Sequence, residues 1–260
     1  MRILCVGDVF GRPGRNALAA TLPGLRREHA IDLVVANGEN SAHGAGMTVL
    51  TARALLDAGV DVITGGNHTF QRRDTAPFLQ QEPRALRPLN YPPGTPGSGL
   101  IELTIGGVRV LVLNVMGRLF MKPIDDPFRV VNETLACADP AIRVIVVDFH
   151  AEATSEKRAM GFFLDGRASV VAGTHTHVPT ADAQILPHGT AYVTDLGMVG
   201  ARHSVIGMEV EAAIQGFLTA VKSKSENAAG PVDVNAALVD VNVTTGHAQS
   251  IRRLDYQVLA

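Results

Sequence analysis

Short apolar runs rich in β-branched residues recur along this chain, and they limit the folds it can adopt more than any other feature. The runs are Ile3–Val6, Leu33–Ala36, Val60–Thr64, Val108–Val115, Val144–Val147 and Ala168–Ala172. They are too short for most helices, and their lack of apolar–polar alternation is typical of strands buried on both faces. The chain is therefore predicted to form around buried β-sheet.

Helical patterns separate the first three runs. One covers Asn16–His29 and is expected to break near Pro23, because proline cannot donate the hydrogen bond of a helix interior. Another covers Thr48–Asp57, with Thr48 as a suitable N-cap and Gly59 just beyond its end. The first half of the chain is thus predicted to be β-α-β-α-β.

Turn residues predict two hairpins, one at Gly106-Gly107 and one near Pro187-His188-Gly189, so that antiparallel strands join the parallel ones. The remaining predicted elements are a helix over Met208–Val221 and strands over Ala236–Val243 and Gln249–Val258. We expect an α/β fold in which two packed mixed β-sheets form a β-sandwich flanked by α-helices.

A length of 260 residues, with 46% hydrophobic and 18% charged residues, is typical of an ordinary globular protein. The proline- and glycine-rich segment 91–99 is interpreted as a surface loop, because the apolar runs on both sides of it have the same composition. We therefore predict a single domain over residues 1–260. Cys5 and Cys137 cannot form a disulfide framework and are predicted to be buried thiols in a reducing compartment.

The formal net charge of -2 gives no basic field for nucleic acid, so contact with RNA would be local to an active site. The apolar N-terminal stretch meets a charge at Asp8, which excludes a signal peptide or a spanning helix there. No later segment is long enough to span a membrane. We expect a cytoplasmic protein that does not bind membranes.

Five strand ends carry side chains that can bind metals. These side chains are Asp8, Glu39, Asn40, Asn67, His150, His175 and His177. The carboxyl ends of strands in α/β sheets converge on one crevice, where residues distant in sequence can meet. Glycines at 7, 38, 65, 66 and 173 would let the backbone approach the ions closely.

Each of these residues alone has a simpler explanation: an aspartate after a strand often forms a turn, and a lone histidine often belongs to the core. Five such strand ends together favour a metal site. Oxygen and imidazole ligands without thiolate suit manganese, iron, zinc or cobalt rather than calcium or an iron–sulfur cluster, and three histidines disfavour magnesium. The sequence has no Walker A motif and no Gly-x-Ser-x-Gly motif.

The order of these blocks resembles the calcineurin-like metallophosphoesterases, and the departures from that pattern resemble its bacterial YmdB-type branch. The matching blocks are Gly7-Asp8-Val9-Phe10, Gly38-Glu39-Asn40, Gly66-Asn67-His68, His150 and Gly173-Thr174-His175-Thr176-His177. Phe10 stands where the superfamily usually has a histidine ligand, and Glu39 stands where it has a bridging aspartate. Asn40 is the expected substitute ligand.

The resemblance implies the calcineurin-like fold and a centre of two divalent transition-metal ions, iron or manganese first and zinc or cobalt as alternatives. One ion would be held by Asp8, Glu39, Asn40 and His177, and the other by Glu39, Asn67, His150 and His175. Glu39 would bridge the ions, and a hydroxide between them would attack phosphorus. His68 would protonate the leaving oxygen, the alternative being that it only hydrogen-bonds to the ligands.

The resemblance also implies the substrate: a small cyclic-nucleotide phosphodiester, 2',3'-cyclic first and 3',5'-cyclic as a further option, with short RNA ends as another. A phosphomonoesterase or protein phosphatase could use the same metal core. A regulator that senses metal or nucleotide without chemistry is a third hypothesis, although it would not need His68 as a proton donor. Whether the chain forms a homo-oligomer is left open.

Overall fold

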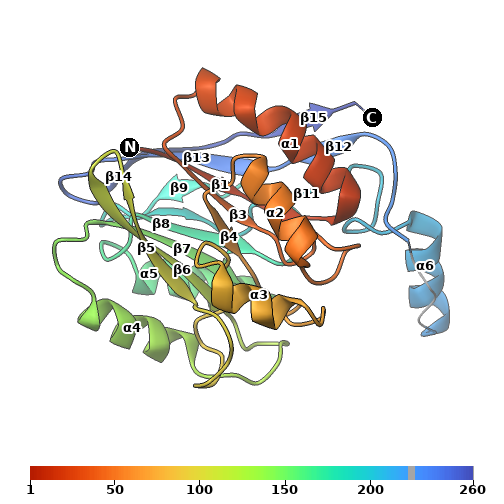
Figure 1. The fold of residues 1–260 in the computed structure, drawn as a ribbon, viewed down its shortest axis with the longest axis horizontal. Helices are drawn as coiled ribbons and strands as arrows, with labels where there is room; N and C mark the ends of the chain where they lie inside the picture. Colours follow the sequence, from red (N-terminus) through yellow and green to blue (C-terminus); the bar gives the residue numbers. More distant parts are fainter. Residues whose placement is uncertain (222–225, 260) are drawn as a thin grey trace.

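The computed structural model describes residues 1–221 and 226–259, and two mixed β-sheets form its centre (Figure 1). The first sheet has five strands in the order β14-β13-β1-β3-β4. Its strands are β1 (Arg2–Val6), β3 (Leu33–Asn37), β4 (Val62–Thr64), β13 (Ala236–Val241) and β14 (Ala248–Arg253). The strands β1, β3 and β4 run parallel, as the predicted β-α-β-α-β pattern requires, and β13 and β14 are antiparallel additions.

The second sheet has six strands in the order β5-β6-β7-β8-β10-β9. They are β5 (Leu100–Ile105), β6 (Val108–Met116), β7 (Val144–His150), β8 (Val170–Thr174), β9 (Gln184–Ile185) and β10 (Ala191–Val193). Both predicted hairpins are confirmed, since β5 pairs antiparallel with β6 and β9 with β10. The parallel strands in the middle of the sheet are almost fully buried, which explains their continuous apolar sequence.

A third, smaller sheet was not predicted. Its order is β15-β12-β11-β2, with β2 (Asp8–Val9), β11 (Met198–Ala201), β12 (Val232–Val234) and β15 (Tyr256–Val258). The predicted strand Gln249–Val258 is wrong as one strand, because the chain leaves the first sheet at Leu254–Asp255. The carboxylate of Asp255 there accepts hydrogen bonds from Asn235 and Ala236, and the chain continues into the third sheet.

Helices cover the outer faces of the two large sheets, so the predicted sandwich wrapped in helices is confirmed (Figure 1). The helices are α1 (Gly11–Glu28), α2 (Val49–Asp57), α3 (Thr75–Gln81), α4 (Pro127–Cys137), α5 (Thr154–Phe163) and α6 (Val210–Thr219). Side chains of α1, α2 and α3 pack on the first sheet, and those of α4 and α5 on the second. Between the sheets lies a separate apolar core that includes Ile3, Val62, Val112 and Val146.

The first two helices agree with the sequence to different degrees. Thr48 caps α2 as expected, with a reciprocal bond to Thr51. The prediction for α1 is wrong at its start and at Pro23, since the helix begins at Gly11 and continues through the proline. Pro23 and Ala19, whose carbonyl loses its helical donor, both lie on the exposed side, where solvent can satisfy that carbonyl.

The two cysteines differ in environment. Cys5 is buried between the sheets as predicted, and its burial raises the pKa of the thiol to about 12. The prediction that Cys137 is buried is wrong. The buried face of α4 contains Pro127 and Val131, and Cys137 falls on the exposed side of the helix.

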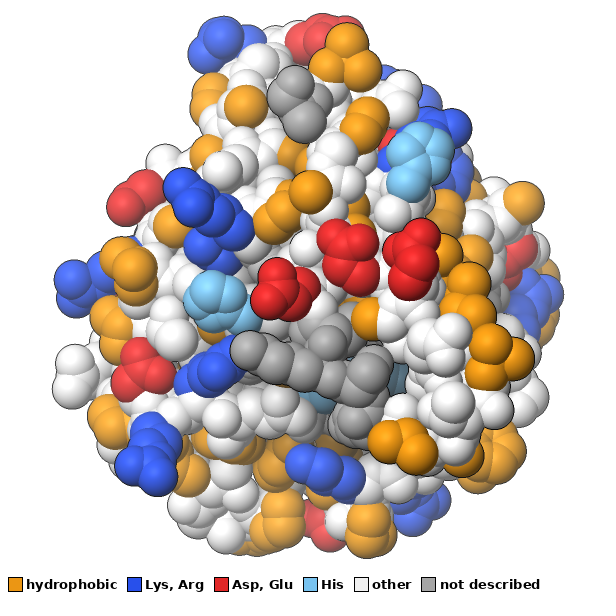
Figure 2. Space-filling view, turned by 90° about the vertical axis from the view of Figure 1, so that its right-hand side faces the viewer, with side chains coloured by type: hydrophobic (Ala, Val, Ile, Leu, Met, Phe, Trp, Pro, Cys, Tyr) orange, Lys and Arg blue, Asp and Glu red, His pale blue; other side chains and the backbone are white. Residues whose placement is uncertain are grey.

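The outer surface mixes charges of both signs. On the face shown in Figure 2, acidic side chains lie side by side near the middle, and basic and apolar side chains are scattered around them without a broad basic area among the side chains described. Helix α6 projects from the body in Figure 1 and buries none of its described residues. Within residues 1–221 and 226–259, no helix is both long and apolar enough to cross a membrane. The cytoplasmic location stays a prediction.

Candidate metal centre

The predicted ligands come together at the carboxyl ends of neighbouring strands. Glu39 and Asn40 follow β3, Asn67 follows β4, His150 ends β7, and His175 follows β8. Asp8 stands just beyond β1, in β2. Among the described residues, one group of histidine and acidic side chains has its ligand atoms close enough together for a single metal ion. It consists of Glu39, His150 and His175, whose ligand atoms all lie within 4.8 Å of one another.

Glu39 lies at the centre of this arrangement and is almost fully buried. Its Oε2 accepts the backbone N–H of His68 at 2.8 Å. Its Oε1 lies 3.1 Å from His150 Nε2, but that nitrogen bonds to Asn67 Oδ1 at 2.9 Å. Glu39 Oε1 is therefore a buried oxygen without a hydrogen-bond donor in the part of the chain described. Such an atom costs free energy unless a cation or water satisfies it, so the donor set fits a metal ion.

A second group of predicted ligands lies beside the first. Asn40 Nδ2 is 3.0 Å from His177 Nε2, and His177 Nε2 is 3.6 Å from Asp8 Oδ1. His177 Nδ1 donates to the carbonyl oxygen of Ile206 at 2.9 Å, which leaves Nε2 free to act as a ligand. Asp8 Oδ1 also lies 3.9 Å from His150 Nδ1, so the two groups are contiguous.

Gly66 is required for this packing. A Cβ added there would overlap His150 Nε2 and the Glu39 carboxylate. Its φ is not positive, so a close approach rather than a left-handed turn explains the glycine. The close approach is to the candidate ligands, and the expected approach of the backbone to the ions stays a prediction.

The acidic groups and imidazoles change one another's pKa values. Burial opposes ionisation of Asp8, but the charges of His177 and His150 outweigh it and hold the pKa of Asp8 well below its usual range. Burial also opposes protonation of His150, but the Glu39 carboxylate raises the pKa of His150 to about 9. A cation at Nε2 would take the place of that proton. Burial and the charge of His150 lower the pKa of His175 to about 3.

His68 contacts the site through its backbone, and the structure does not bring its imidazole against a ligand side chain. The amide of Gln71 lies 2.5 Å from His68 Nδ1. Because that amide nitrogen can only donate, Nδ1 must accept in this arrangement, and the neutral ring then carries its proton on Nε2.

Sequence reasoning missed a polar chain beneath the ligands. His150 Nδ1 lies 3.0 Å from Thr174 Oγ1, which donates to Asp148 Oδ1 at 2.7 Å. Asp148 also accepts from Thr64 and from Asn37. These contacts fix the orientation of the His150 ring. The available signal was spacing: Asp148 lies two residues before His150, and alternate residues of a strand share a face.

Glu152 was also missed. Its Oε2 lies 3.0 Å from His175 Nε2, and its side chain is half exposed at the edge of the site. Its carboxylate is thus within reach of one predicted ligand while remaining open to solvent.

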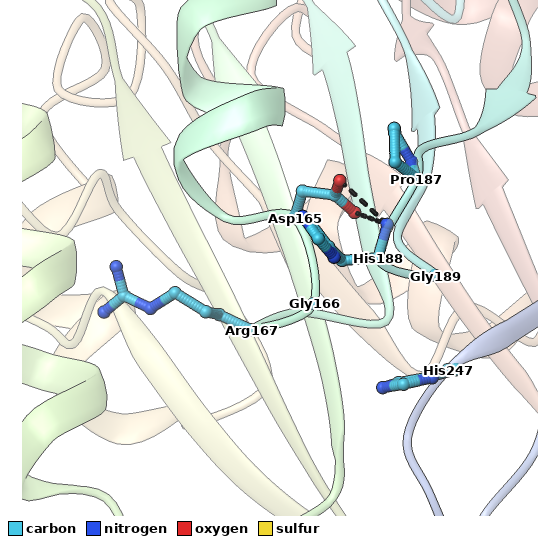
Figure 3. A pocket seen from close by; sticks show the side chains of 7 residues that line it. All are labelled: Asp165, Gly166, Arg167, Pro187, His188, Gly189 and His247. Atoms are coloured by element: carbon cyan, nitrogen blue, oxygen red, sulfur yellow. Dashed lines mark hydrogen bonds between the residues drawn. The ribbon is translucent and has the colours of Figure 1, made fainter.

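Two other histidines line an open depression away from the predicted ligands (Figure 3). The carboxylate of Asp165 there accepts the backbone N–H of His188, at 3.1 and 3.0 Å to its two oxygens. It also accepts from Thr190, so it stabilises the predicted turn at Pro187–Gly189. His247 packs on Gly189 rather than on the carboxylate. The depression is thus a product of the hairpin and offers no cluster of metal ligands.

The comparisons with known proteins agree with this geometry. A model of the family described as YmdB-like protein matches residues 4–254. A 2',3'-cyclic-nucleotide 2'-phosphodiesterase of Bacillus subtilis is 43% identical over 98% of this chain and 96% of its own length. A structure described as a novel phosphatase from Mycoplasma pneumoniae is 33% identical, with a TM-score of 0.93, and the match covers 99% of this chain and 93% of that one.

More distant structures show the same fold. A 5'-nucleotidase precursor from Thermus thermophilus aligns with 100% of this chain and 54% of its own, at a TM-score of 0.56 and 13% identity. The fold and these relatives define a hydrolase of the calcineurin-like metallophosphoesterase class. Within that class, the chain belongs to the YmdB-like family.

Proposed function

We propose that this protein is a phosphodiesterase with two metal ions that hydrolyses 2',3'-cyclic nucleotides, with 3',5'-cyclic nucleotides as additional substrates to be tested. The observation that carries the proposal is the buried Glu39 carboxylate, whose Oε1 has no donor among the described groups and faces His150 Nε2. The Asp8, Asn40 and His177 side chains adjoin this point. The name of the Bacillus relative supports the substrate class.

Under this proposal, Asp8, Asn40 and His177 would hold one ion, Asn67, His150 and His175 would hold the other, and Glu39 would contribute to both. Iron or manganese suits this ligand set best. When bound, two divalent ions would neutralise the phosphate and lower the pKa of a water molecule. The protein holds the ligand atoms in position: His177 through Ile206, and His150 through Thr174.

His68 is the proposed proton donor. Attack of a water molecule, which releases one proton to solvent, forms a new P–O bond and breaks the bond from phosphorus to the ribose O2', which leaves as an alkoxide and needs a proton. The protonated His68 ring donates from Nε2 and becomes neutral, and a proton from solvent restores it. For this form of the ring, the exposed Gln71 amide turns so that its oxygen accepts from Nδ1. The product is a nucleoside 3'-phosphate.

Two aryl substrates test the proposal. Protein loaded with Mn²⁺ should hydrolyse bis(p-nitrophenyl) phosphate faster than p-nitrophenyl phosphate, and it should convert a 2',3'-cyclic nucleotide to the 3'-phosphate without further hydrolysis. The description of the Mycoplasma structure as a phosphatase favours a phosphomonoesterase as the second candidate. A higher kcat/KM for the monoester, or free nucleoside as the product, would decide for that candidate.

A further inference from the structure

The turn that carries two of the proposed ligands has an unusual backbone. After β8, His175 has φ of 101° and His177 has φ of 64°. Non-glycine residues adopt positive φ infrequently, and such conformations persist only where the surroundings hold them. The directions of both imidazoles therefore depend on what fixes the residue between them, Thr176.

A buried carboxylate fixes Thr176. Asp195 Oδ2 accepts the backbone N–H of Thr176 at 3.1 Å and its hydroxyl at 2.8 Å. The other oxygen, Oδ1, accepts the N–H of Gly197 at 2.8 Å. On the other side of Thr176, Asp8 Oδ2 accepts the N–H of His175 at 3.0 Å. Consecutive amides of the turn are thus held by two different buried carboxylates.

Lys157 of α5 neutralises Asp195. Its Nζ lies 2.5 Å from Asp195 Oδ2, and both side chains are 1% exposed. A buried carboxylate without a counter-charge is costly, so loss of the lysine should displace the Asp195 side chain from Thr176. The lysine stem also lies against the strand that leads to the turn, because a Cβ on Gly173 would be 3.2 Å from Lys157 Cδ. Neither Lys157 nor Asp195 is one of the proposed ligands.

We propose that Lys157 and Asp195 are positioning residues: through Thr176 they fix His175 and His177 in the orientation that binds metal. This inference rests on the proposed function, since it assumes that these histidines are ligands. It adds to that function a supporting role for the buried Lys157–Asp195 ion pair, which contacts the turn at Thr176.

Metal affinity measures this role. In calorimetric titrations of metal-free protein with Mn²⁺, Lys157→Met and Asp195→Asn should each weaken binding by about 10- to 100-fold, the usual cost of losing an orienting partner. The double variant carries no buried charge at this pair, and the amide oxygen that it introduces at position 195 can still accept from Thr176. It should bind Mn²⁺ more tightly than either single variant.

The kinetics give a second readout. With bis(p-nitrophenyl) phosphate at saturating Mn²⁺, kcat of the single variants should fall while KM changes little.

A matched control separates positioning from general stability. Met160→Ala removes a fully buried side chain from the same helix, and it should lower Tm while leaving Mn²⁺ affinity unchanged. Thr176→Val removes only the hydroxyl bond, and it provides a milder variant if the charge variants do not fold. It should weaken Mn²⁺ binding several-fold.

Hydrogen exchange gives a readout that needs no metal. In metal-free Lys157→Met, the amides of His175 and Thr176 should exchange faster, while those in the middle of β6 and β7 should not. Wild-type Mn²⁺ affinity in the folded variants, with only Tm lowered as in Met160→Ala, would refute the inference. If wild-type protein binds Mn²⁺ but hydrolyses no phosphodiester, the proposed function is wrong. The Mn²⁺ affinities of the variants would still show whether Lys157 and Asp195 position the histidines.

Discussion

At the scale of single residues, Glu39 is the side chain on which the proposed centre depends most. It is buried, imidazole charges lower its pKa, and one of its oxygens has no donor among the described groups. We predict that Glu39→Gln will retain its fold but lose at least one metal ion and nearly all turnover, because a neutral amide cannot bridge two cations. Elemental analysis, circular dichroism and phosphodiesterase assays measure the three effects.

The exposed Glu133→Gln, on α4, is a control with the same chemical change. It should keep both metal ions and full activity. Two metal ions and near wild-type turnover in Glu39→Gln would remove the bridge from the proposal.

If His68 is a general acid, the loss of rate caused by its replacement should depend on the leaving group of the substrate. His68→Ala should retain both ions, since the structure shows no bond from its ring to the ligand side chains described. Cleavage of a 2',3'-cyclic nucleotide should fall by about 10²- to 10⁴-fold, because the ribose alkoxide needs a proton. Cleavage of bis(p-nitrophenyl) phosphate should fall much less, because p-nitrophenolate leaves without one. Equal losses on both substrates, or loss of a metal ion, would contradict the assignment of His68 as a general acid.

At the scale of elements, α1 contains a proline that lowers the stability of the helix. Pro23 interrupts the hydrogen bonding of the helix on its exposed side. Pro23→Ala should raise the free energy of unfolding by about 1–3 kcal/mol, as it restores one N–H donor and removes the clash with the preceding turn. Urea denaturation measures the change.

The neighbouring Gly24→Ala separates that effect from simple helix propensity. A Cβ at Gly24 meets nothing within 4 Å, so this variant should gain about 0.5–1 kcal/mol. A gain for Pro23→Ala no larger than that for Gly24→Ala would mean that the missing hydrogen bond costs little in this helix.

The elements also show what could be predicted from the sequence. Local signals were sufficient where one segment determines its own conformation, as where Thr48 caps its helix. Glu39 and His150 are distant in sequence, but both stand at the carboxyl ends of buried strands, and the convergence of such ends was enough to place them together. Other partners distant in sequence gave no such signal. The third sheet pairs strands of a few residues from both ends of the chain, and Lys157 meets Asp195 across 38 positions. No periodicity in either segment indicates such a contact.

At the scale of the whole molecule, the proposed ligands belong to different layers. Glu39, Asn40 and Asn67 follow strands of the first sheet, His150 and His175 come from the second, and Asp8 lies in the third. Ions bound there would connect all three sheets, and unfolding would have to release them. The single-domain organisation, which stays a prediction, implies that this connection stabilises the chain as one cooperative unit.

Metal binding should therefore raise the melting temperature of the entire protein. A ligand at 100 times its Kd stabilises the native state by about 2.7 kcal/mol, which corresponds to roughly 5–10 °C for a chain of this size. We predict a rise of that order when Mn²⁺ is added to metal-free protein, a smaller rise with Mg²⁺, and reversal by a chelator. Differential scanning calorimetry of wild type and Glu39→Gln measures it. Equal shifts in the two proteins would mean that the stabilising ions bind elsewhere, because the variant lacks the carboxylate that joins the layers.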